Sequence, residues 1–236
     1  MRILITLCAR GGSKGIPGKN IRPINGVPLI GYSIGTAKSF ANKFNANIAL
    51  STDSEVIKKT TESFGIITSY IRPAILATDE AGKLGAIRDL IRYEEEIRNV
   101  RYDYILDLDI SSPLRNLNDL ASAFEIICGD EHALNLFSVN PANRNPYFNM
   151  VEQQPNGYYG LIKKGDSLTR QSAPKVYDLN ASFYFYRRSF FDSEIPVVNQ
   201  FSMIYVMPHL CFDLDHEIDF KFMEFLIANN QLGFDL

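Results

Sequence analysis

The sequence has few features that would place it in a redox, secreted or membrane class. Cys8, Cys128 and Cys211 lie far apart, and no two have the short spacing of a zinc or redox motif. We expect three buried free thiols. No apolar run approaches the roughly 18 residues of a membrane span, and the N-terminal run ends at Arg10 without a cleavage-like site. We therefore expect a cytoplasmic protein with no membrane partner.

Acidic residues are absent from the first 52 positions, although the whole chain has a net charge of −3. Of the 24 lysines and arginines, seven lie in this segment, whereas all 27 acids follow it. A small positive field on an acidic body suits a compact anionic ligand better than a long nucleic-acid track. We therefore expect no nucleic-acid partner.

Apolar periodicity predicts alternating strands and helices in one domain over residues 1–236, a length that suits one large domain better than two. We expect strands at 2–8, 46–51, 65–71, 103–110, 133–139, 182–188 and 201–207. We expect helices at 28–40 and from about residues 54, 82, 118 and 216, with Asn118 as a cap. The alternation predicts an α/β fold with a mostly parallel sheet, helices on both faces, and ligands beyond the carboxyl ends of the strands.

Four of these helices have an apolar stripe that should face the core. The stripes are Leu29, Ile30, Ile34 and Ala37 in the first, Leu84, Ile87, Ile91 and Ile97 in the second, Leu120, Phe124 and Ile127 in the third, and Ile218, Phe222, Phe225 and Leu226 in the fourth. Between about residues 140 and 180 the chain becomes rich in Asn, Pro, Gly and Tyr. We interpret this segment as an inserted hairpin or arm.

The first predicted strand runs into a loop, ARGGSKGIPGKN, with four glycines, three cations and no carboxylate. It is not a Walker A loop, because five residues separate Gly12 from Gly18 and Asn20 follows Lys19; the dinucleotide-binding glycine pattern also fails. Glycines still let backbone amides approach an anion, and Arg10, Lys14 and Lys19 would add positive charge. The alternative is a flexible turn whose cations are solvated.

Two aspartates near the end of the chain suggest a metal site. Asp213 and Asp215 are two residues apart in a strand-like stretch, so both carboxylates would share one face while Leu214 enters the core. Such a pair suits Mg²⁺, which is commonly held by one or two carboxylates plus substrate phosphates. The alternative is that Asp215 only caps the last helix. Asp107 and Asp109 form a second Asp-x-Asp pair.

Seven motifs in the same order resemble the acylneuraminate cytidylyltransferases, which make CMP-activated sialic acids and related nine-carbon acids. They are ARGGSKGIPGKNI at 9–21, LSTDS at 50–54, RPAILATD at 72–79, SSPLR at 111–115, RQSAP at 170–174, NASFYFY at 180–186 and FDLD at 212–215. The resemblance covers nearly the whole chain. It implies a Rossmann-like nucleotidyltransferase fold, a homodimer formed through the inserted arm, and dependence on Mg²⁺.

The resemblance also assigns roles by position. For CTP binding it implies Arg10, Gly11, Ser13, Lys14, Lys19, Asn20, Arg72 and Thr78. For the sugar acid it implies Asp109, Arg170, Gln171, Asn180 and Tyr184. For catalysis it implies Arg10, Lys19, Asp213 and Asp215, the last two as metal ligands. Surface or strand-packing roles are the alternatives for Arg170, Asn180 and Tyr184.

The chain departs from the sialate pattern mainly on the sugar side. Asp109 replaces a glutamine, Ala181 and Ser182 replace Gly and Ala, and Phe148 stands where a lysine is frequent. We therefore expect transfer of CMP from CTP to a sialic-acid-like nonulosonate such as legionaminic acid, with release of pyrophosphate. The alternatives are a Kdo cytidylyltransferase, a nucleotide-sugar glycosyltransferase that uses Asp107 and Asp109 for its metal, and a catalytically dead nucleotide-binding module.

Overall fold

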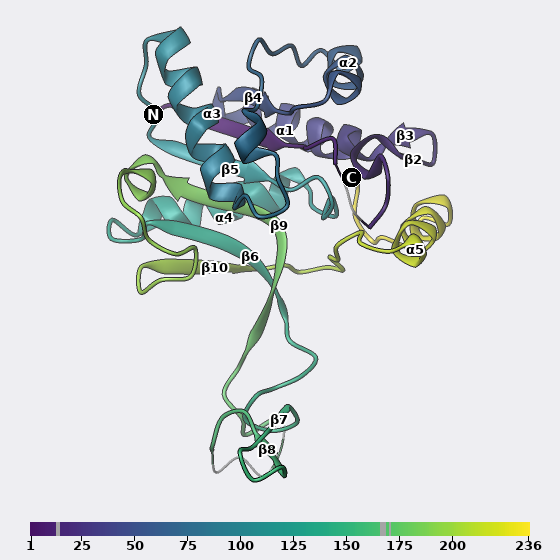
Figure 1. Ribbon diagram of the computed structural model, residues 1–236, viewed down its shortest axis with the longest axis vertical. Coiled ribbons are helices and arrows are strands. Elements are labelled where there is room, and N and C mark those ends of the chain that lie inside the picture. The colour runs from purple at the N-terminus through teal and green to yellow at the C-terminus, as the bar shows by residue number, and fades with distance from the viewer. Residues whose placement is uncertain (13–14, 166–168, 170) are drawn as a thin grey trace.

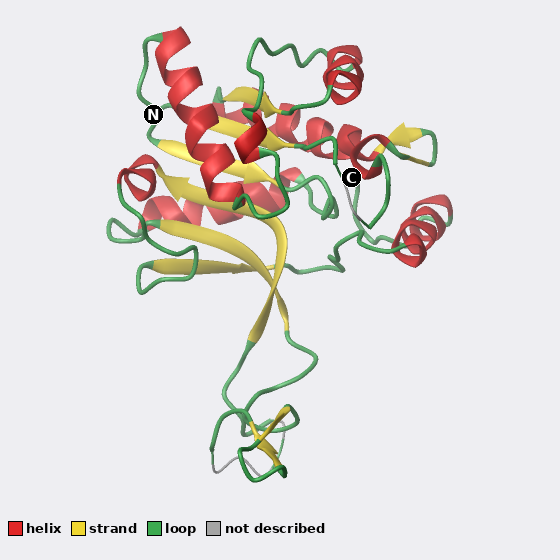
Figure 2. Ribbon diagram, in the orientation of Figure 1, coloured by secondary structure: helices red, strands yellow, loops and turns green. Residues whose placement is uncertain are grey.

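The computed structural model describes residues 1–12, 15–165, 169 and 171–236. Its centre is a six-stranded sheet in the order β10-β6-β9-β5-β1-β4 (Figures 1 and 2). Strand β9 is antiparallel to both of its neighbours, and the other pairs are parallel, so the predicted mostly parallel sheet is confirmed. The strands are β1 (Ile3–Cys8), β4 (Asn47–Ser51), β5 (Tyr104–Leu108), β6 (Asn135–Pro141), β9 (Tyr177–Arg187) and β10 (Ser202–Val206).

Helices cover both faces of the sheet, as predicted. The helices are α1 (Leu29–Phe44), α2 (Glu55–Ser63), α3 (Lys83–Arg98), α4 (Leu117–Gly129) and α5 (Glu217–Ala228). Side chains of β1 alternate between two apolar clusters: Ile5 packs in the cluster with α1 and α4, whereas Leu4 packs in the cluster with α3. Figure 1 shows α3 in front of the sheet. No helix of the described residues is long and apolar enough to cross a membrane.

The predicted arm is confirmed as a projection from the sheet. Strands β6 and β9 remain paired as far as Pro141 and Tyr177, and the chain between them extends away from the body (Figure 1). It includes an antiparallel pair formed by β7 (Val151–Gln153) and β8 (Tyr159–Leu161). The remaining elements are the β2 (Pro23–Ile24) and β3 (Val27–Pro28) pair and 3-10 helices at Lys19–Ile21, Ala74–Leu76 and Arg188–Asp192.

The strand predicted at 65–71 is wrong, although its burial pattern alternates as a strand's does. Ile66 and Tyr70 are buried and Ile67 and Ile71 are exposed, but the segment belongs to none of the sheets, which leaves β4 at the edge. Only where it ends does Arg72 donate a backbone hydrogen bond to the loop after β4. Alternating burial indicates an extended chain with one face buried. Such a chain becomes a strand only if a neighbouring strand is available to form backbone hydrogen bonds with it.

Two predicted stripes also need correction. In α3, Ile97 is 56% exposed in the last turn, whereas Glu94 is buried and its carboxylate accepts a hydrogen bond from Arg98 at 2.7 Å. The predicted stripe of α4 is confirmed, since its three members are buried.

Cys128 is exposed and Cys8 half-buried, so only Cys211 is the buried free thiol that we expected.

In α5 the buried residues are Phe220, Met223 and Leu226, so of the four predicted residues only Leu226 is buried. Phe220 and Met223 belong to the main apolar cluster, which accounts for this rotation of the helix. The Arg22 guanidinium adds contacts on the same helix: it lies 4.5 Å from the centre of the Phe220 ring and is hydrogen-bonded to both carboxylate oxygens of Glu217.

The cap of α4 is Asn116 and not Asn118. Asn116 accepts from the Asp119 amide at 3.0 Å, and Asp119 in return accepts from the Asn116 amide at 2.8 Å, which forms a capping box. We expect Asn116→Ala to lower the free energy of unfolding by about 1 kcal/mol. The matched change Asn118→Ala, at an exposed position in the first turn, should change it by less than about 0.5 kcal/mol. Urea unfolding of both variants checks this, and equal losses would contradict the assignment.

Candidate active site

A cleft of about 260 Å³ lies beyond the carboxyl ends of β1 and β5, beside the start of α3. Its lining combines cations, carboxylates and a few small apolar groups. The lining residues are Cys8, Arg10, Lys19, Asn20, Arg72, Leu76, Thr78, Asp79, Ala81, Lys83, Ala86, Asp109, Ile110 and Ser111. This is the edge of the sheet at which a parallel α/β fold binds ligands.

Cations from the loop after β1 meet carboxylates at this cleft. Arg10 Nη2 lies 2.8 Å from the Asp79 carboxylate, and Arg10 Nη1 donates to the Thr78 carbonyl at 2.9 Å. Lys19 Nζ lies 3.1 Å from the Asp215 carboxylate. Both cations are therefore aimed at oxygen anions in the structure, which is the arrangement that a phosphate site requires.

The backbone of the loop also donates to an anion. The Gly11 amide donates to Asp53 Oδ1 at 2.7 Å, and the Asn20 side chain donates to the Arg10 carbonyl at 2.9 Å, which joins the two ends of the loop. A Cβ atom at Gly11 would lie only 3.0 Å from the Ser54 side chain, so any other residue here would have to displace that side chain slightly.

Arg72 adds a third cation on the wall of the cleft. Its side chain is held at the end of β4, where Nε donates to Ser51 Oγ and Nη2 donates to the Ser51 carbonyl, each at 2.8 Å. Arg72 is only 6% exposed. A guanidinium fixed in this way is pre-organised, so that little side-chain entropy is lost when an anion binds.

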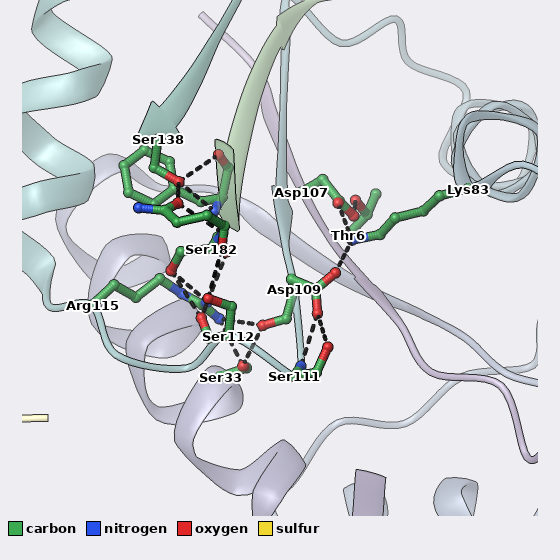
Figure 3. A network of polar contacts seen from close by, with 12 residues as sticks. Thr6, Ser33, Lys83, Asp107, Asp109, Ser111, Ser112, Arg115, Ser138 and Ser182 are labelled. Atoms are coloured by element: carbon green, nitrogen blue, oxygen red, sulfur yellow. Dashed lines mark hydrogen bonds and ion pairs between the residues drawn. The ribbon is translucent and has the colours of Figure 1, made fainter. Parts of the chain in front are cut away.

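Lys83, the first residue of α3, joins both members of the second Asp-x-Asp pair (Figure 3). Its Nζ lies 2.7 Å from Asp107 and 2.8 Å from Asp109. Burial alone would raise the pKa of Asp109, but the Lys83 ammonium and the hydrogen bonds of Ser111 outweigh burial and lower this pKa to about 2. Burial likewise opposes the ammonium, yet the two carboxylates raise the pKa of Lys83 well above its usual value. We call Lys83, Asp107 and Asp109 the lysine–aspartate triad.

The turn after β5 is held by a fully buried arginine. Arg115 Nη1 donates to the carbonyls of Ser112 and Ser182, and Nη2 donates to Ser33 Oγ and the Asp109 carbonyl, at distances of 2.6 to 3.0 Å (Figure 3). Burial lowers the pKa of Arg115 to about 10, so the group stays cationic at neutral pH. One side chain thus ties α1, the end of β5 and β9 together.

Of the predicted sugar-side residues on β9, Asn180 is 5% exposed and Tyr184 half-buried. The Asn180 side chain accepts from Ser138 Oγ at 2.6 Å and donates to Asn140 at 3.0 Å. Burial raises the pKa of Tyr184 to about 12, and the centre of its ring lies 6.0 Å from Lys83 Nζ. The Asn180 side chain is therefore already hydrogen-bonded to other residues of the protein, whereas Tyr184 lies beside the triad. Their sugar-binding roles stay predictions.

Between them, Ala181 has a φ of 55°, a left-handed conformation that glycine adopts more easily. The register of β9 against β6 shifts at this point, between Phe137 and Val139. One of the departures from the sialate pattern, Ala in place of Gly, therefore falls on a strained position of a β-bulge.

The predicted metal ligands lie in the segment after β10, which is irregular and not the strand-like stretch that we expected. Leu214 is fully buried, as predicted, and its amide donates to the Ser111 carbonyl at 2.8 Å. Asp213 Oδ1 is buried and has no hydrogen-bond partner in the described part of the chain. Burial and then the charge of Asp109 raise the pKa of Asp213 to about 6.

Asp215 does not cap the last helix. The residue that precedes α5 is His216, and the Asp219 carboxylate accepts from the amides of both Asp215 and His216. The Asp215 side chain is 62% exposed and pairs with Lys19 instead. The alternative interpretation of Asp215 as a cap is therefore wrong.

Several predicted site residues cannot be placed in the cleft. Ser13, Lys14 and Arg170 lie outside the described residues. Gln171 is exposed in the arm, where it lines a separate, more apolar cavity with Pro141 and Tyr177.

Sequence reasoning gave no role to Lys83 or Arg115. A signal for Lys83 was present, because a cation at the first position of a helix opposes the helix dipole and calls for compensating acids. Arg115 is part of the quoted SSPLR motif, but nothing in the sequence distinguishes a buried arginine from an exposed one.

Comparisons with known proteins agree with this geometry. The model of the cytidylyltransferase family matches residues 4–221. The chain is 43% identical over 231 residues to post-translational flagellin modification protein B of Campylobacter coli, with 98% of this chain and 97% of that protein covered. It is 42% identical over 232 residues to the CMP-N,N'-diacetyllegionaminic acid synthase of Campylobacter jejuni subsp. jejuni, with the same coverage.

The fold has a counterpart among solved structures. A CMP:2-keto-3-deoxy-manno-octonic acid synthetase complexed with CTP superposes with a TM-score of 0.69, covering 98% of this chain and 100% of that one. The sequence identity is 14%, so this likeness concerns the fold alone. It confirms the Rossmann-like nucleotidyltransferase architecture.

Arg115 offers a test of how the site is held. Arg115→Met should lower the free energy of unfolding by about 3 kcal/mol, because the buried carbonyls and the Ser33 hydroxyl lose their donor. Arg92→Met, at an exposed position of α3, is the matched control and should cost less than about 0.5 kcal/mol. Chemical unfolding of both variants is the measurement. Similar losses in the two would show that the Arg115 hydrogen bonds contribute little to stability.

Proposed function

Because this chain belongs to the cytidylyltransferase family, we propose that it transfers CMP from CTP to the anomeric hydroxyl of a sialic-acid-like nine-carbon sugar acid and releases pyrophosphate. One observation carries the proposal: the loop after β1 presents Arg10, Lys19 and the Gly11 amide to carboxylate oxygens at the ligand-binding edge of the sheet. In the proposed complex, phosphate oxygens of CTP replace the Asp79 carboxylate at Arg10 and the Asp53 carboxylate at the Gly11 amide, and join Asp215 beside Lys19. Arg72 and Asn20 complete the nucleotide side of the cleft.

The identity of the sugar acid is proposed from the relatives and from the departures in the sequence. A relative of 42% identity is named a CMP-N,N'-diacetyllegionaminic acid synthase, so we assign a legionaminic-acid-type substrate. Asp109 lines the cleft, and Tyr184 of β9 lies beside the triad. We place the sugar acid there, with Arg170, Gln171 and Asn180 as further candidate contacts.

The proposed reaction is an in-line substitution at phosphorus. The anomeric oxygen forms a bond to the α-phosphorus of CTP, the bond from that phosphorus to the bridging oxygen breaks, and pyrophosphate leaves as the hydroxyl loses its proton. Arg10 and Lys19 lie where they would stabilise charge on the phosphates as the bond breaks. Fixed charges of this kind, together with the alignment of the two substrates, supply most of the rate in such reactions.

The donor set beside the loop fits a magnesium ion. Asp213 has a buried carboxylate oxygen without a hydrogen-bond partner in the described chain, and the charges of Asp109 and Asp215 crowd it. A divalent cation would satisfy that oxygen and relieve the repulsion. No group of three or more His, Cys, Asp or Glu among the described residues is arranged to hold a metal. We therefore propose Asp213 and Asp215 as the protein ligands, with substrate oxygens completing the coordination.

When bound there, Mg²⁺ would supply electrostatic stabilisation of the phosphates and lower the pKa of the attacking hydroxyl. Lys19 Nζ lies 3.1 Å from the Asp215 carboxylate, so the proposed phosphate-binding cation and the proposed metal ligand lie side by side. The glycosyltransferase alternative, with the metal at Asp107 and Asp109, is less favoured because Lys83 already pairs with both carboxylates.

We also propose a homodimer formed through the arm. The tip of the arm exposes apolar side chains that have no core to enter: Val151 is 60% exposed, Tyr158 76% and Tyr159 68%. A projection of this kind, exposed on all sides, is stabilised when a second copy covers it.

The function is tested by measuring pyrophosphate release. We expect turnover with CTP, Mg²⁺ and a legionaminic-acid-type substrate, and none with ATP or GTP, because a site that hydrogen-bonds one base rejects another by several orders of magnitude. A panel that includes N-acetylneuraminate and Kdo ranks the sugar acids. The proposal is wrong if no acid on the panel releases pyrophosphate while a CMP-sugar is consumed in the presence of an acceptor.

The metal ligands are tested by Asp215→Asn. Because Asp215 is exposed and not a cap, the melting temperature should stay within a few degrees of the original value. Turnover should fall by about 100-fold, equivalent to about 2.7 kcal/mol of transition-state stabilisation, with partial recovery in Mn²⁺. If Asp215→Asn were nearly silent while Asp109→Asn abolished metal-dependent turnover, the metal would belong to the triad and not to this segment.

A further inference from the structure

Two members of the lysine–aspartate triad, Lys83 and Asp107, have no task in the proposed function. Asp107 is completely buried, Asp109 is 21% exposed, and Lys83 is 35% exposed at the wall of the cleft. Thr6 Oγ1 donates to Asp107 Oδ1 at 2.8 Å, so Asp107 is also held from β1. Buried ion pairs stabilise a fold poorly compared with apolar packing. A unit of this kind at the edge of a substrate cleft therefore needs another explanation.

The geometry fixes the orientation of Asp109. Its Oδ1 accepts from the amide and the hydroxyl of Ser111, each at 2.8 Å, and its Oδ2 accepts from Lys83 at 2.8 Å. With donors on both oxygens, the carboxylate cannot rotate without breaking a hydrogen bond. An ionised carboxylate has about four acceptor positions, and the protein uses three of them. The remaining position accepts from an N–H or O–H donor and repels an anion.

The sheet order indicates which substrate meets this acceptor. The loop that would hold the phosphates follows β1, and Arg72 is fixed at the end of β4. Asp109 follows β5, on the opposite side of β1, and β9 is the next strand. A nucleotide on the β1 and β4 side leaves the β5 and β9 side to the acceptor. The hydroxyl and amide groups of a sugar acid are neutral donors of the required kind.

We propose that Lys83 is a positioning residue that holds Asp109 as a fixed, ionised acceptor for a hydroxyl or amide donor of the sugar acid, so that Lys83 and Asp109 together determine which sugar acid is used. This inference rests on the proposed function. Lys83 acts through Asp109 and does not itself contact the reacting atoms. Its removal is therefore expected to change the sugar KM far more than the CTP KM.

The test needs a variant that loses Lys83 without leaving two unpaired buried carboxylates. Lys83→Met alone would do that and is expected to unfold easily. In the double variant Lys83→Met with Asp107→Asn, the triad keeps its net charge of about −1, since a single Asp109 charge replaces two carboxylates and one ammonium. The asparagine can still bond to Thr6. Far-UV circular dichroism and a melting curve establish that the double variant is folded.

The readout is the pair of KM values in the pyrophosphate-release assay. For the double variant we expect the sugar KM to rise at least about tenfold and the CTP KM to change less than about threefold, as for loss of a hydrogen bond to a charged group. Asp109→Asn should give a similar rise. Added to the double variant, it should cost less than about threefold more, because residues that act as one unit are not additive.

Each contrary result has a separate meaning. A double variant with the original sugar KM would overturn the inference, since Lys83 would then only balance charge. Strictly additive effects of the double variant and Asp109→Asn would show that Lys83 does not act through Asp109. A rise in the CTP KM with loss of discrimination against UTP would assign the donor to the cytosine amino group and also overturn it. Absence of turnover in the unaltered enzyme would instead sink the proposed function, on which the inference rests.

Discussion

The buried guanidinium of Arg115 is the constraint on which the geometry of the site depends. It bonds to carbonyls and a hydroxyl from α1, from the turn after β5 and from β9, so these three segments cannot shift independently. A buried cation keeps its charge only if it is surrounded by fixed dipoles. The turn that begins at Asp109 is therefore fixed by hydrogen bonds on its buried side. As a result, the Asp109 side chain enters the cleft in a fixed orientation.

A second layer of the site consists of charges that balance one another across long sequence distances. Three cations of the N-terminal segment that lacks acids form ion pairs with carboxylates far along the chain: Arg10 pairs with Asp79, Lys19 with Asp215 and Arg22 with Glu217. At least three of the seven cations of that segment are thus paired in the tertiary structure. In the cleft Arg10 is already oriented, and a phosphate oxygen can replace the Asp79 carboxylate beside it.

What the sequence predicted well depended on local chemistry. Continuous apolar runs located the buried strands, and the glycines and cations after β1 predicted a loop whose residues do line the cleft, without any need for a Walker motif. What it missed depended on neighbours distant in the chain. Residues 65–71 alternate as a strand does but have no pairing partner, and α5 buries Phe220 and Met223 in the core where another face was expected. The role of Lys83 depends on two aspartates more than 20 residues away along the chain. The helix and strand periodicities of a sequence do not predict contacts over such a separation.

The lysine–aspartate triad also accounts for one departure from the sialate pattern, Asp109 in place of a glutamine. A glutamine at position 109 is neutral and needs no cation, whereas an aspartate buried beside Asp107 requires one, and Lys83 at the start of α3 supplies it. The lysine in turn opposes the helix dipole and is tolerated only because both carboxylates hold it. Asp109 and Lys83 therefore form one unit of charge, and a glutamine at position 109 would leave Lys83 with Asp107 alone as its partner.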